Sequence, residues 1–345
     1  MRKDYIDIQD YSKEELETLL DLIVPMKAAY KARELPNLLD RRTLSMVFLG
    51  SSLRTRMSFE VAMNALGGSG LYIRPGDLHL GKKETLKDTA IVMGSMCDGI
   101  VCRSPQYSDI AGLSKYAKVS VINGMADDCN HPTQALCDVF TMIEKSGKLE
   151  GLNLAFVGDT SKGFGVIGRD LMLMASKLGF NFFCASPKEY RVDDEYREMI
   201  MDNALKSGAE IVITEDPKAV VENADFLTCD AITWYGFEDE EEDRFRILMP
   251  YQVNAELFKG APSRCLFLHC LPAKRGEEVT AAVIDGPKSV VFEQAENRLH
   301  TELALCAAFL GDEVDLDRIE LNGNGSENNR KIIEILRKWY ALQTQ

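Results

Sequence analysis

Short apolar runs typical of β-strands alternate with helical patterns along almost the whole chain, and this alternation constrains the fold more than any other feature. Strands that alternate with helices form parallel sheets with right-handed crossovers. We therefore expect an α/β protein with two domains, each a parallel sheet flanked by helices, a cleft between them and an extra C-terminal helix. Strands are expected at 42–50, 70–74, 99–103 and 119–123 in the first domain, and at 152–157, 181–185, 210–214, 226–229, 265–269 and 289–292 in the second.

The domain boundaries follow from length and from one polar stretch. A chain of 345 residues is too long for one ordinary core, so two domains are expected. The stretch 146–151 (SGKLEG) marks the boundary between them. We expect the first domain at 1–146, the second at 147–295, a helix over 296–320 that returns to the first domain, and a linker with a C-terminal helix at 321–345.

The expected C-terminal helix carries one apolar stripe, at positions 332, 335, 336, 339 and 342. A lone amphipathic helix must cover another surface. The sequence alone favours its own domain over a neighbouring subunit.

Composition and charge exclude several classes of function. The formal net charge of −14 argues against nucleic acid as a partner, although an acidic surface would suit a small cationic substrate. The N-terminal residues contain no apolar run of the signal-peptide kind, and no apolar segment is as long as a membrane span, so we expect a cytoplasmic protein without a membrane partner. Nine scattered cysteines without a CxxC pair indicate reduced thiols, and the spacing of zinc ligands is absent, so no metal is expected.

Residues 51–56 (SSLRTR) join an expected strand to an expected helix. At such a turn the first helical N–H groups point outward and attract anions. Ser52 and Thr55 add hydroxyl donors, and the fork of Arg54 matches a phosphate. The simpler alternative is an ordinary N-cap followed by surface arginines.

Two further polar stretches also follow expected strands. Residues 131–134 (HPTQ) begin a helix, where a histidine and an amide could both bind a carbonyl oxygen; a capped helix with a solvent-facing His131 is the alternative. Residues 269–272 (HCLP) end an apolar strand. Pro272 disfavours helix at Leu271 and leaves carbonyls free to accept bonds from an amine, while Cys270 is expected to be a buried thiol rather than a nucleophile.

A competing motif is the GxGxxG at 163–168, which follows an expected strand and precedes a helix as a dinucleotide site requires. Residues 159–162 lengthen its turn, and Glu189, the candidate for the ribose acid, lies beyond the tip of the next strand. Glycines that allow tight strand–helix packing are the alternative, and we expect no NAD binding.

The three polar stretches, together with 291–298 (VFEQAENR), resemble the motifs of the aspartate/ornithine carbamoyltransferase family in order and spacing from about residue 5 to 310. The resemblance implies catalytic roles for Arg54, Arg103, His131, Gln134 and Cys270. It further implies that carbamoyl phosphate is bound by Ser52, Leu53, Arg54, Thr55, His79, Arg103, His131, Gln134 and Arg298, and the amine by Asp230, Trp234, Tyr235, Cys270 and Leu271.

Within the family the chain resembles the putrescine carbamoyltransferases. Residues 234–236 (WYG) stand where ornithine enzymes carry Ser-Met-Gly, 275–279 (RGEEV) follow the HCLP stretch, and the extra C-terminal helix resembles one that packs on a neighbouring subunit. The resemblance therefore implies a homotrimer held by that helix. Leu53 and His79 depart from the family pattern, the spacing from Asp230 to Trp234 is longer, and 160–168 lack the Asn that ornithine enzymes use on the amino-acid head.

The reaction implied by this resemblance is attack of a neutral primary amine on the carbamoyl carbon, with phosphate leaving. Positioning and oxyanion stabilisation suffice for it, so no cofactor is expected. Putrescine is the expected acceptor, and the alternatives are ornithine or another amine. An NAD-dependent oxidoreductase and an inactive carbamoyl-phosphate-binding protein are more distant alternatives.

Overall fold

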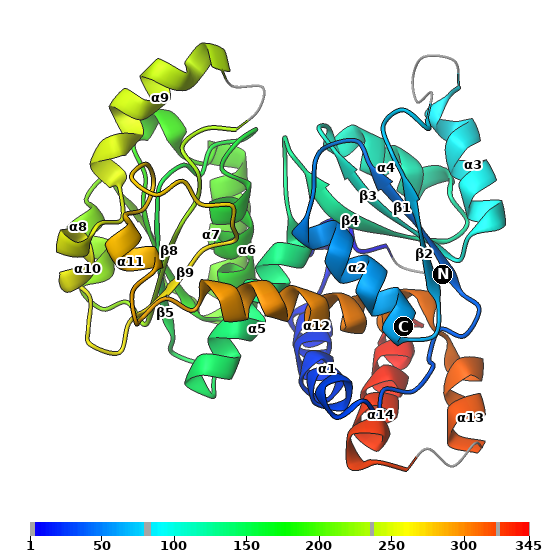
Figure 1. Cartoon of the computed structure of the whole chain (residues 1–345). Helices are drawn as coiled ribbons and strands as arrows, with labels where there is room; N and C mark the ends of the chain where they lie inside the picture. The colour runs from blue at the N-terminus through cyan, green and yellow to red at the C-terminus, as the bar shows by residue number, and fades with distance from the viewer. Residues whose placement is uncertain (1–3, 79–83, 235–237, 322–324, 345) are drawn as a thin grey trace. The chain divides into compact units, whose positions relative to one another are not determined.

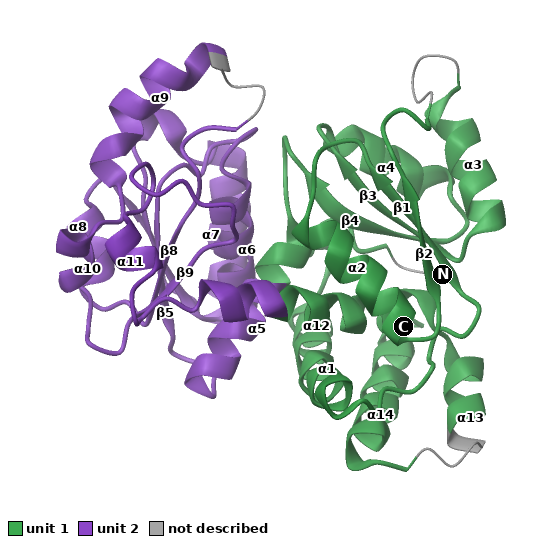
Figure 2. Cartoon of the chain, in the orientation of Figure 1, with its two compact units in different colours: residues 1–136, 297–345 green, residues 137–296 purple. Residues whose placement is uncertain are grey.

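The structure is a computed structural model that describes residues 4–78, 84–234, 238–321 and 325–344. The chain forms two compact units (Figures 1 and 2). Unit 1 comprises residues 1–136 and 297–345, and unit 2 comprises residues 137–296. The division falls inside two helices, α5 (Pro132–Ser146) and α12 (Val291–Leu310), whereas the sequence placed it at 146–151.

Unit 1 contains a four-stranded sheet in the order β2-β1-β3-β4, with every neighbouring pair parallel. Helix α2 packs against β1 and β2, and α4 packs against β3 and β4. The other elements of this unit are α1 (Lys13–Ala32), β1 (Thr43–Phe48), α2 (Arg54–Ala65), β2 (Ser69–Ile73), α3 (Leu86–Met96), β3 (Gly99–Ser104), α4 (Tyr107–Tyr116), β4 (Ser120–Ala126), α13 (Glu313–Leu321) and α14 (Glu327–Leu342).

Unit 2 contains a five-stranded sheet in the order β7-β6-β5-β8-β9, again parallel throughout. The expectation of two parallel sheets flanked by helices is confirmed. Besides parts of α5 and α12, the unit consists of β5 (Asn153–Val157), α6 (Val166–Leu178), β6 (Asn181–Ala185), α7 (Asp194–Ser207), β7 (Ile211–Thr214), α8 (Pro217–Val221), β8 (Phe226–Cys229), α9 (Glu241–Leu248), α10 (Ala255–Lys259), β9 (Leu266–Leu268) and α11 (Ala281–Ile284).

One expected strand is wrong. Residues 289–292 were expected to extend the second sheet, but Ser289 makes only an isolated bridge to Phe267 and α12 begins at Val291. A short apolar run has no period of its own, so it fits a buried strand and the first turn of a buried helix equally well.

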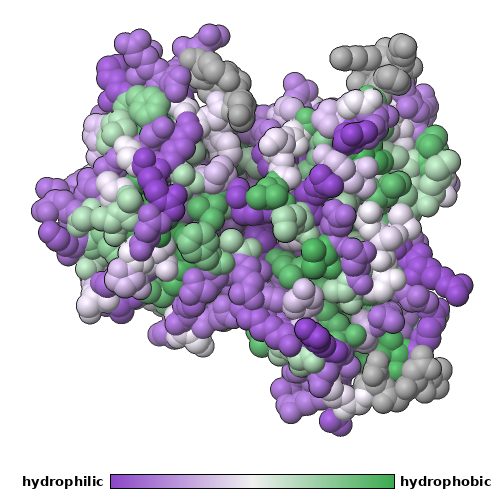
Figure 3. All heavy atoms as spheres, in the orientation of Figure 1, coloured by the Kyte–Doolittle hydropathy of each residue, from purple (hydrophilic) through white to green (hydrophobic). Residues whose placement is uncertain are grey.

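The acidic run 238–243 leads into α9. The side chains of Glu241, Glu242 and Asp243 are exposed in the first turn of that helix, where the positive end of the helix dipole favours carboxylates. Figure 3 shows hydrophilic side chains gathered over this region of unit 2.

The C-terminal helix α14 packs along α1 of the same chain. Ile332, Leu336 and Trp339 are buried, and the Trp339 Nε1 donates a hydrogen bond to the carbonyl oxygen of Ala308 at 3.1 Å. The sequence alone favoured packing against its own domain, whereas the resemblance implied a neighbouring subunit; the apolar stripe is largely covered within unit 1. Its part in oligomerisation stays a prediction.

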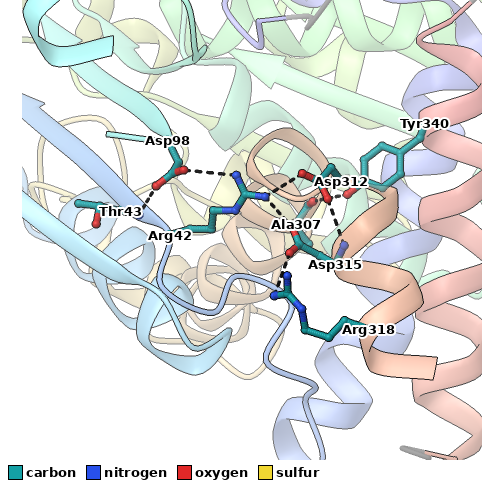
Figure 4. Close-up of polar contacts among 8 residues, drawn as sticks. All are labelled: Arg42, Thr43, Asp98, Ala307, Asp312, Asp315, Arg318 and Tyr340. Atoms are coloured by element: carbon teal, nitrogen blue, oxygen red, sulfur yellow. Dashed lines mark hydrogen bonds and ion pairs between the residues drawn. The ribbon is translucent and has the colours of Figure 1, made fainter. Parts of the chain in front are cut away.

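Arg42, at the start of β1, ties the C-terminal segment to the sheet (Figure 4). Its guanidinium donates to the Asp98 carboxylate at 3.3 Å, to Asp312 at 2.7 Å and to Asp315 at 3.0 Å. Asp98 in turn accepts a bond from the backbone N–H of Thr43 at 2.8 Å. The guanidinium thus links the amino ends of β1 and β3 to α13.

In the described parts of the chain, no helix combines the length and the apolar character needed to cross a membrane.

Candidate active site

The polar stretches of each unit follow the carboxyl ends of neighbouring strands. In unit 1 the strand order reverses between β1 and β3, and the α2 turn follows β1 while Arg103 lies in β3. In unit 2 it reverses between β5 and β8, and Asp159 and Asp230 follow those two strands. Ligands of open α/β sheets bind at such reversal points. Each unit therefore has one candidate half-site, described separately below.

His131 is the centre of the half-site in unit 1. Its side chain is 6% exposed, so the alternative of a solvent-facing histidine is wrong. Burial holds the pKa of His131 well below its ordinary value, and the charges of Arg298, Arg103 and Arg54 lower it further. The imidazole is therefore neutral at pH 7, and the positive charges of three guanidinium groups help to keep it so. A neutral ring among three cations suits a carbonyl group joined to an anion.

Arg298 in α12 joins the residues of this half-site. Its Nη1 donates to the side-chain oxygen of Gln134 at 2.6 Å, and its Nη2 donates to the hydroxyls of Thr55 and Thr133, each at 3.2 Å. Nη2 also pairs with Glu302 at 2.7 Å, while Nε is buried without a hydrogen-bond partner in the described part of the chain. Thr133 and Glu302 were missed as site residues. Glu302 was detectable, because it lies four residues after Arg298, the spacing of helical ion pairs.

Arg103 is the last residue but one of β3 and pairs with Asp127 through Nη2 at 3.2 Å. Its Nε is buried, and no residue that the structure describes accepts a hydrogen bond from it. A buried donor without an acceptor is costly, so an anionic ligand at this position would satisfy it. Asp127 is a further residue that the sequence did not single out. Burial raises its pKa above the ordinary value, and Arg103 only partly opposes that shift.

The start of α2 is not capped by a side chain. The N-cap residue is Leu53, whose side chain is 66% exposed and makes no capping hydrogen bond. The alternative of an ordinary Ser or Thr N-cap is therefore wrong here. Arg56 stacks 3.6 Å from the ring centre of Tyr72. Ser52 is half-buried beside this turn, and His79 lies outside the described residues.

In unit 2, Asp230 follows β8 and is the centre of the second half-site. Its Oδ1 accepts from the backbone N–H of Ala231 at 2.8 Å and from the Cys270 thiol at 3.6 Å, while Oδ2 is buried and has no partner among the described residues. Burial raises the pKa of Asp230 to about 7, and the hydrogen bond from the N–H of Ala231 opposes that shift. Asp230 lines a small pocket with Asp159 and Glu278. Three carboxyl groups around one pocket favour a cationic ligand.

His269, which follows β9, is held in one tautomer. Its backbone N–H donates to Gln294, and its Nδ1 accepts from the N–H of Leu271 at 2.9 Å. The ring proton therefore lies on Nε2, which is 3.4 Å from Glu278 Oε1 but has no well-aligned hydrogen bond. Leu271 itself has a left-handed backbone with φ of 58°. Roles for His269 and Glu278 were not anticipated, although both lie in stretches that the sequence singled out.

The rings of Phe164 and Trp234 pack together near Asp159. Arg244 forms a buried ion pair with Asp159, and its guanidinium stacks 3.6 Å from the ring centre of Phe164. The ring of Trp234 packs edge-on against Phe164 at 5.9 Å. The structure thus brings Asp230 and Cys270 together and places Trp234 against Phe164. Tyr235 lies outside the described residues.

The GxGxxG glycines have a packing explanation. A Cβ at Gly165 would lie 2.4 Å from the Cα of Thr160, and one at Gly168 would lie 2.7 Å from the ring of Phe156. The close approach of α6 to β5 therefore requires glycine at these two positions. Among the described residues no group of three or more His, Cys, Asp or Glu side chains is arranged to hold a metal ion.

Two family models match the chain. The carbamoyl-phosphate-binding domain of aspartate/ornithine carbamoyltransferases matches residues 3–144, and the aspartate/ornithine-binding domain of that family matches residues 150–309.

Individual relatives agree with the family models. The chain is 44% identical to the ornithine carbamoyltransferase of Thermococcus kodakarensis over 90% of this chain and 96% of that one. It is 41% identical to the putrescine carbamoyltransferase of Mycoplasma capricolum over 90% of this chain and 87% of that one. The solved structure of ornithine carbamoyltransferase from Pyrococcus furiosus matches with a TM-score of 0.83 and 42% identity, over 88% of this chain and 96% of that one.

Proposed function

Because the chain belongs to the aspartate/ornithine carbamoyltransferase family, we propose that it transfers the carbamoyl group of carbamoyl phosphate to the primary amine of a small substrate, ornithine or putrescine. The observation that carries this proposal is the half-site of unit 1, where three arginines act on the buried, neutral His131. A dianionic phosphate attached to a small carbonyl group matches that arrangement in both charge and hydrogen bonding.

In the proposed mechanism, Arg54, Arg103 and Arg298 bind the phosphate, and His131 and Gln134 bind the carbamoyl oxygen. The amine nitrogen forms a bond to the carbamoyl carbon, the bond from that carbon to the bridging oxygen breaks, and phosphate leaves with the electron pair. Each hydrogen bond to an oxygen on which charge develops typically lowers the barrier by about 2.7–4 kcal/mol.

The attacking amine must first lose a proton. Asp230 is the proposed acceptor, because its pKa is about 7 and its Oδ2 has no partner among the residues that the structure describes. An alkylammonium with a pKa near that of lysine, about 10.4, gives its proton to such a group at a cost of roughly 4–5 kcal/mol. Cys270, whose thiol bonds to Asp230, would help to orient the amine.

The two acceptors draw support from different observations. The comparisons favour ornithine, because relatives named for that amine are the more similar and the more numerous among those found. The described pocket residues favour putrescine. The stretch 160–168 offers no Asn for an α-amino-acid head. Phe164, which belongs to that stretch, is buried against the side chains of Trp234 and Arg244.

A product assay tests the proposal. Carbamoyl phosphate is incubated with ornithine, putrescine or a control amine, and the ureido product is measured to give kcat/KM for each acceptor. Product with either diamine supports carbamoyl transfer, and the larger kcat/KM identifies the acceptor. Absence of product with both, while NAD-dependent oxidation of small alcohols proceeds, would contradict the assignment.

A cytoplasmic homotrimer is also part of the proposal. Its support is the family resemblance, since the apolar stripe of α14 is covered by α1 within this chain. Analytical ultracentrifugation of the full chain should give a mass three times that of the 38.6 kDa protomer. A monomer at micromolar concentration would contradict it.

A further inference from the structure

Gln294 lies in α12, in the part of that helix that belongs to unit 2 (Figure 2). Its side chain is buried, and both ends of its amide form hydrogen bonds. Oε1 accepts from the backbone N–H of His269 at 2.8 Å, and Nε2 donates to Oδ1 of Asp138 in α5 at 2.6 Å. The sequence drew attention to the stretch 291–298 but assigned a role there to Arg298 alone. One glutamine side chain thus joins the segment that follows β9 to helix α5.

The segment that Gln294 holds contains the residues that would orient the amine. The thiol of Cys270 donates to Asp230, and the imidazole of His269 accepts from the N–H of Leu271 at 2.9 Å. Leu271 has a left-handed backbone, with φ of 58°. This conformation is unfavourable for a residue with a β-carbon and persists only where the surroundings hold it. The shape of the segment therefore depends on its anchors, and Gln294 supplies one at His269.

The contact between Gln294 and α5 is made at two points. Besides the bond to Asp138, the thiol of Cys137 donates to the carbonyl oxygen of Gln294 at 3.3 Å. Asp138 and Gln294 are both buried, so water cannot replace the bond between their side chains when it is lost. The side chain at position 294 must accept from an N–H and donate to a carboxyl oxygen. Glutamine does both, whereas ionised glutamate only accepts and leucine does neither.

We propose that Gln294 is a positioning residue for carbamoyl transfer. It fixes the segment 269–271 on α5, so that Cys270 and Leu271 hold the amine in the orientation from which it attacks. The inference rests on the proposed function, because its kinetic consequence requires that reaction. Gln294 acts through His269, and the groups that bind the amine are kept when Gln294 is replaced. Since misplacing a reacting group by about 1 Å can slow a reaction about a hundredfold, the effect is expected in kcat more than in KM.

A reversal of hydrogen-bond polarity tests this role. In Gln294→Glu the introduced carboxylate still accepts from the N–H of His269, but it faces Asp138 without a proton to donate. With the better of the two acceptor amines, kcat should fall about tenfold or more, while the KM for carbamoyl phosphate stays unchanged. Adding Asp138→Asn supplies the missing donor, so the double variant should recover most of the lost kcat. Glu293→Gln, which removes a partly exposed ion pair with Lys145 between the same two helices, is the matched control and should behave like wild type.

Hydrogen exchange measures the anchoring without any reaction. The peptide that contains His269 and Leu271 should exchange faster in Gln294→Leu, which removes the acceptor, and at the wild-type rate in Glu293→Gln. If the wild-type protein transfers no carbamoyl group, the proposed function fails, whereas this measurement still decides whether Gln294 holds the segment.

Three results would overturn the inference: an unchanged kcat in Gln294→Glu, a double variant no more active than that single variant, or unchanged exchange in Gln294→Leu. A role in stability alone would lower the folded fraction without this split between kcat and KM. Circular dichroism of each variant measures the folded fraction, and the double variant, which restores a paired amide and carboxyl group, should melt close to wild type.

Discussion

Replacing Arg298 by methionine should lower the unfolding free energy by about 3–5 kcal/mol, the usual cost of removing one partner of a buried ion pair. The guanidinium is 2% exposed and binds Gln134, Thr55, Thr133 and Glu302, so methionine leaves a buried carboxylate and three polar groups without their donor. At roughly 1.4 kcal/mol per tenfold, the unfolding equilibrium constant should rise by about two to three and a half powers of ten.

The loss should depend on pH. Burial raises the pKa of Glu302 to about 7, and Arg298 opposes that shift. Without Arg298 the pKa is higher still, whereas a glutamate in the unfolded chain titrates near about 4.3. Between these values the folded variant binds a proton that the unfolded chain does not, so its stability falls as pH rises. The difference from wild type should therefore be larger at about pH 8 than at about pH 6.

Urea unfolding followed by circular dichroism at the two pH values measures this effect. Glu302→Leu provides the matched second change, because Arg298→Met combined with Glu302→Leu leaves no buried charge and should recover most of the lost stability. Carbamoyl transfer should stay impaired in the double variant if Arg298 binds phosphate. A loss below about 1 kcal/mol in Arg298→Met, or a double variant no more stable than the single one, would refute the reasoning.

Arg54→Ala should lower kcat/KM with an unchanged fold, by an amount that corresponds to an activation free energy about 2–4 kcal/mol higher. Arg56→Ala, which removes a side chain stacked on the ring of Tyr72, should leave steady-state kinetics nearly unaltered. Equal effects of the two would count against the phosphate assignment. The KM for the amine should rise as pH falls below about 7, where Asp230 becomes protonated, and Asp230→Asn should abolish that pH dependence. Leu53→Thr should change the melting temperature little, because Leu53 is 66% exposed, and should tighten carbamoyl phosphate binding or leave it unchanged; a large loss of affinity would show that the leucine has a specific contact. Trp339→Ala should destabilise unit 1 by about 3–5 kcal/mol in urea, and a neutral result would show that α14 does not brace α1.

The alternation of strands and helices was sufficient to predict two parallel sheets, because period and turn chemistry are local properties of the sequence. The capping box of α1 is equally local: Ser12 Oγ accepts from the N–H of Glu15, whose carboxylate accepts from the N–H of Ser12. The polar stretches could be located for the same reason, since each follows a strand and begins or precedes a helix.

Tertiary structure alone decided which of these residues act on one another. The pairing of Arg298 with Thr55 joins positions 243 apart in the chain, and no local pattern encodes such a contact. The sequence could not show that a helix begins at Val291, because a short apolar run has no period that distinguishes a buried helix from a buried strand. The stripe of α14 favoured its own domain but did not identify the element that covers it, since any apolar surface offers the same chemistry; in this chain, packing against α1 covers it.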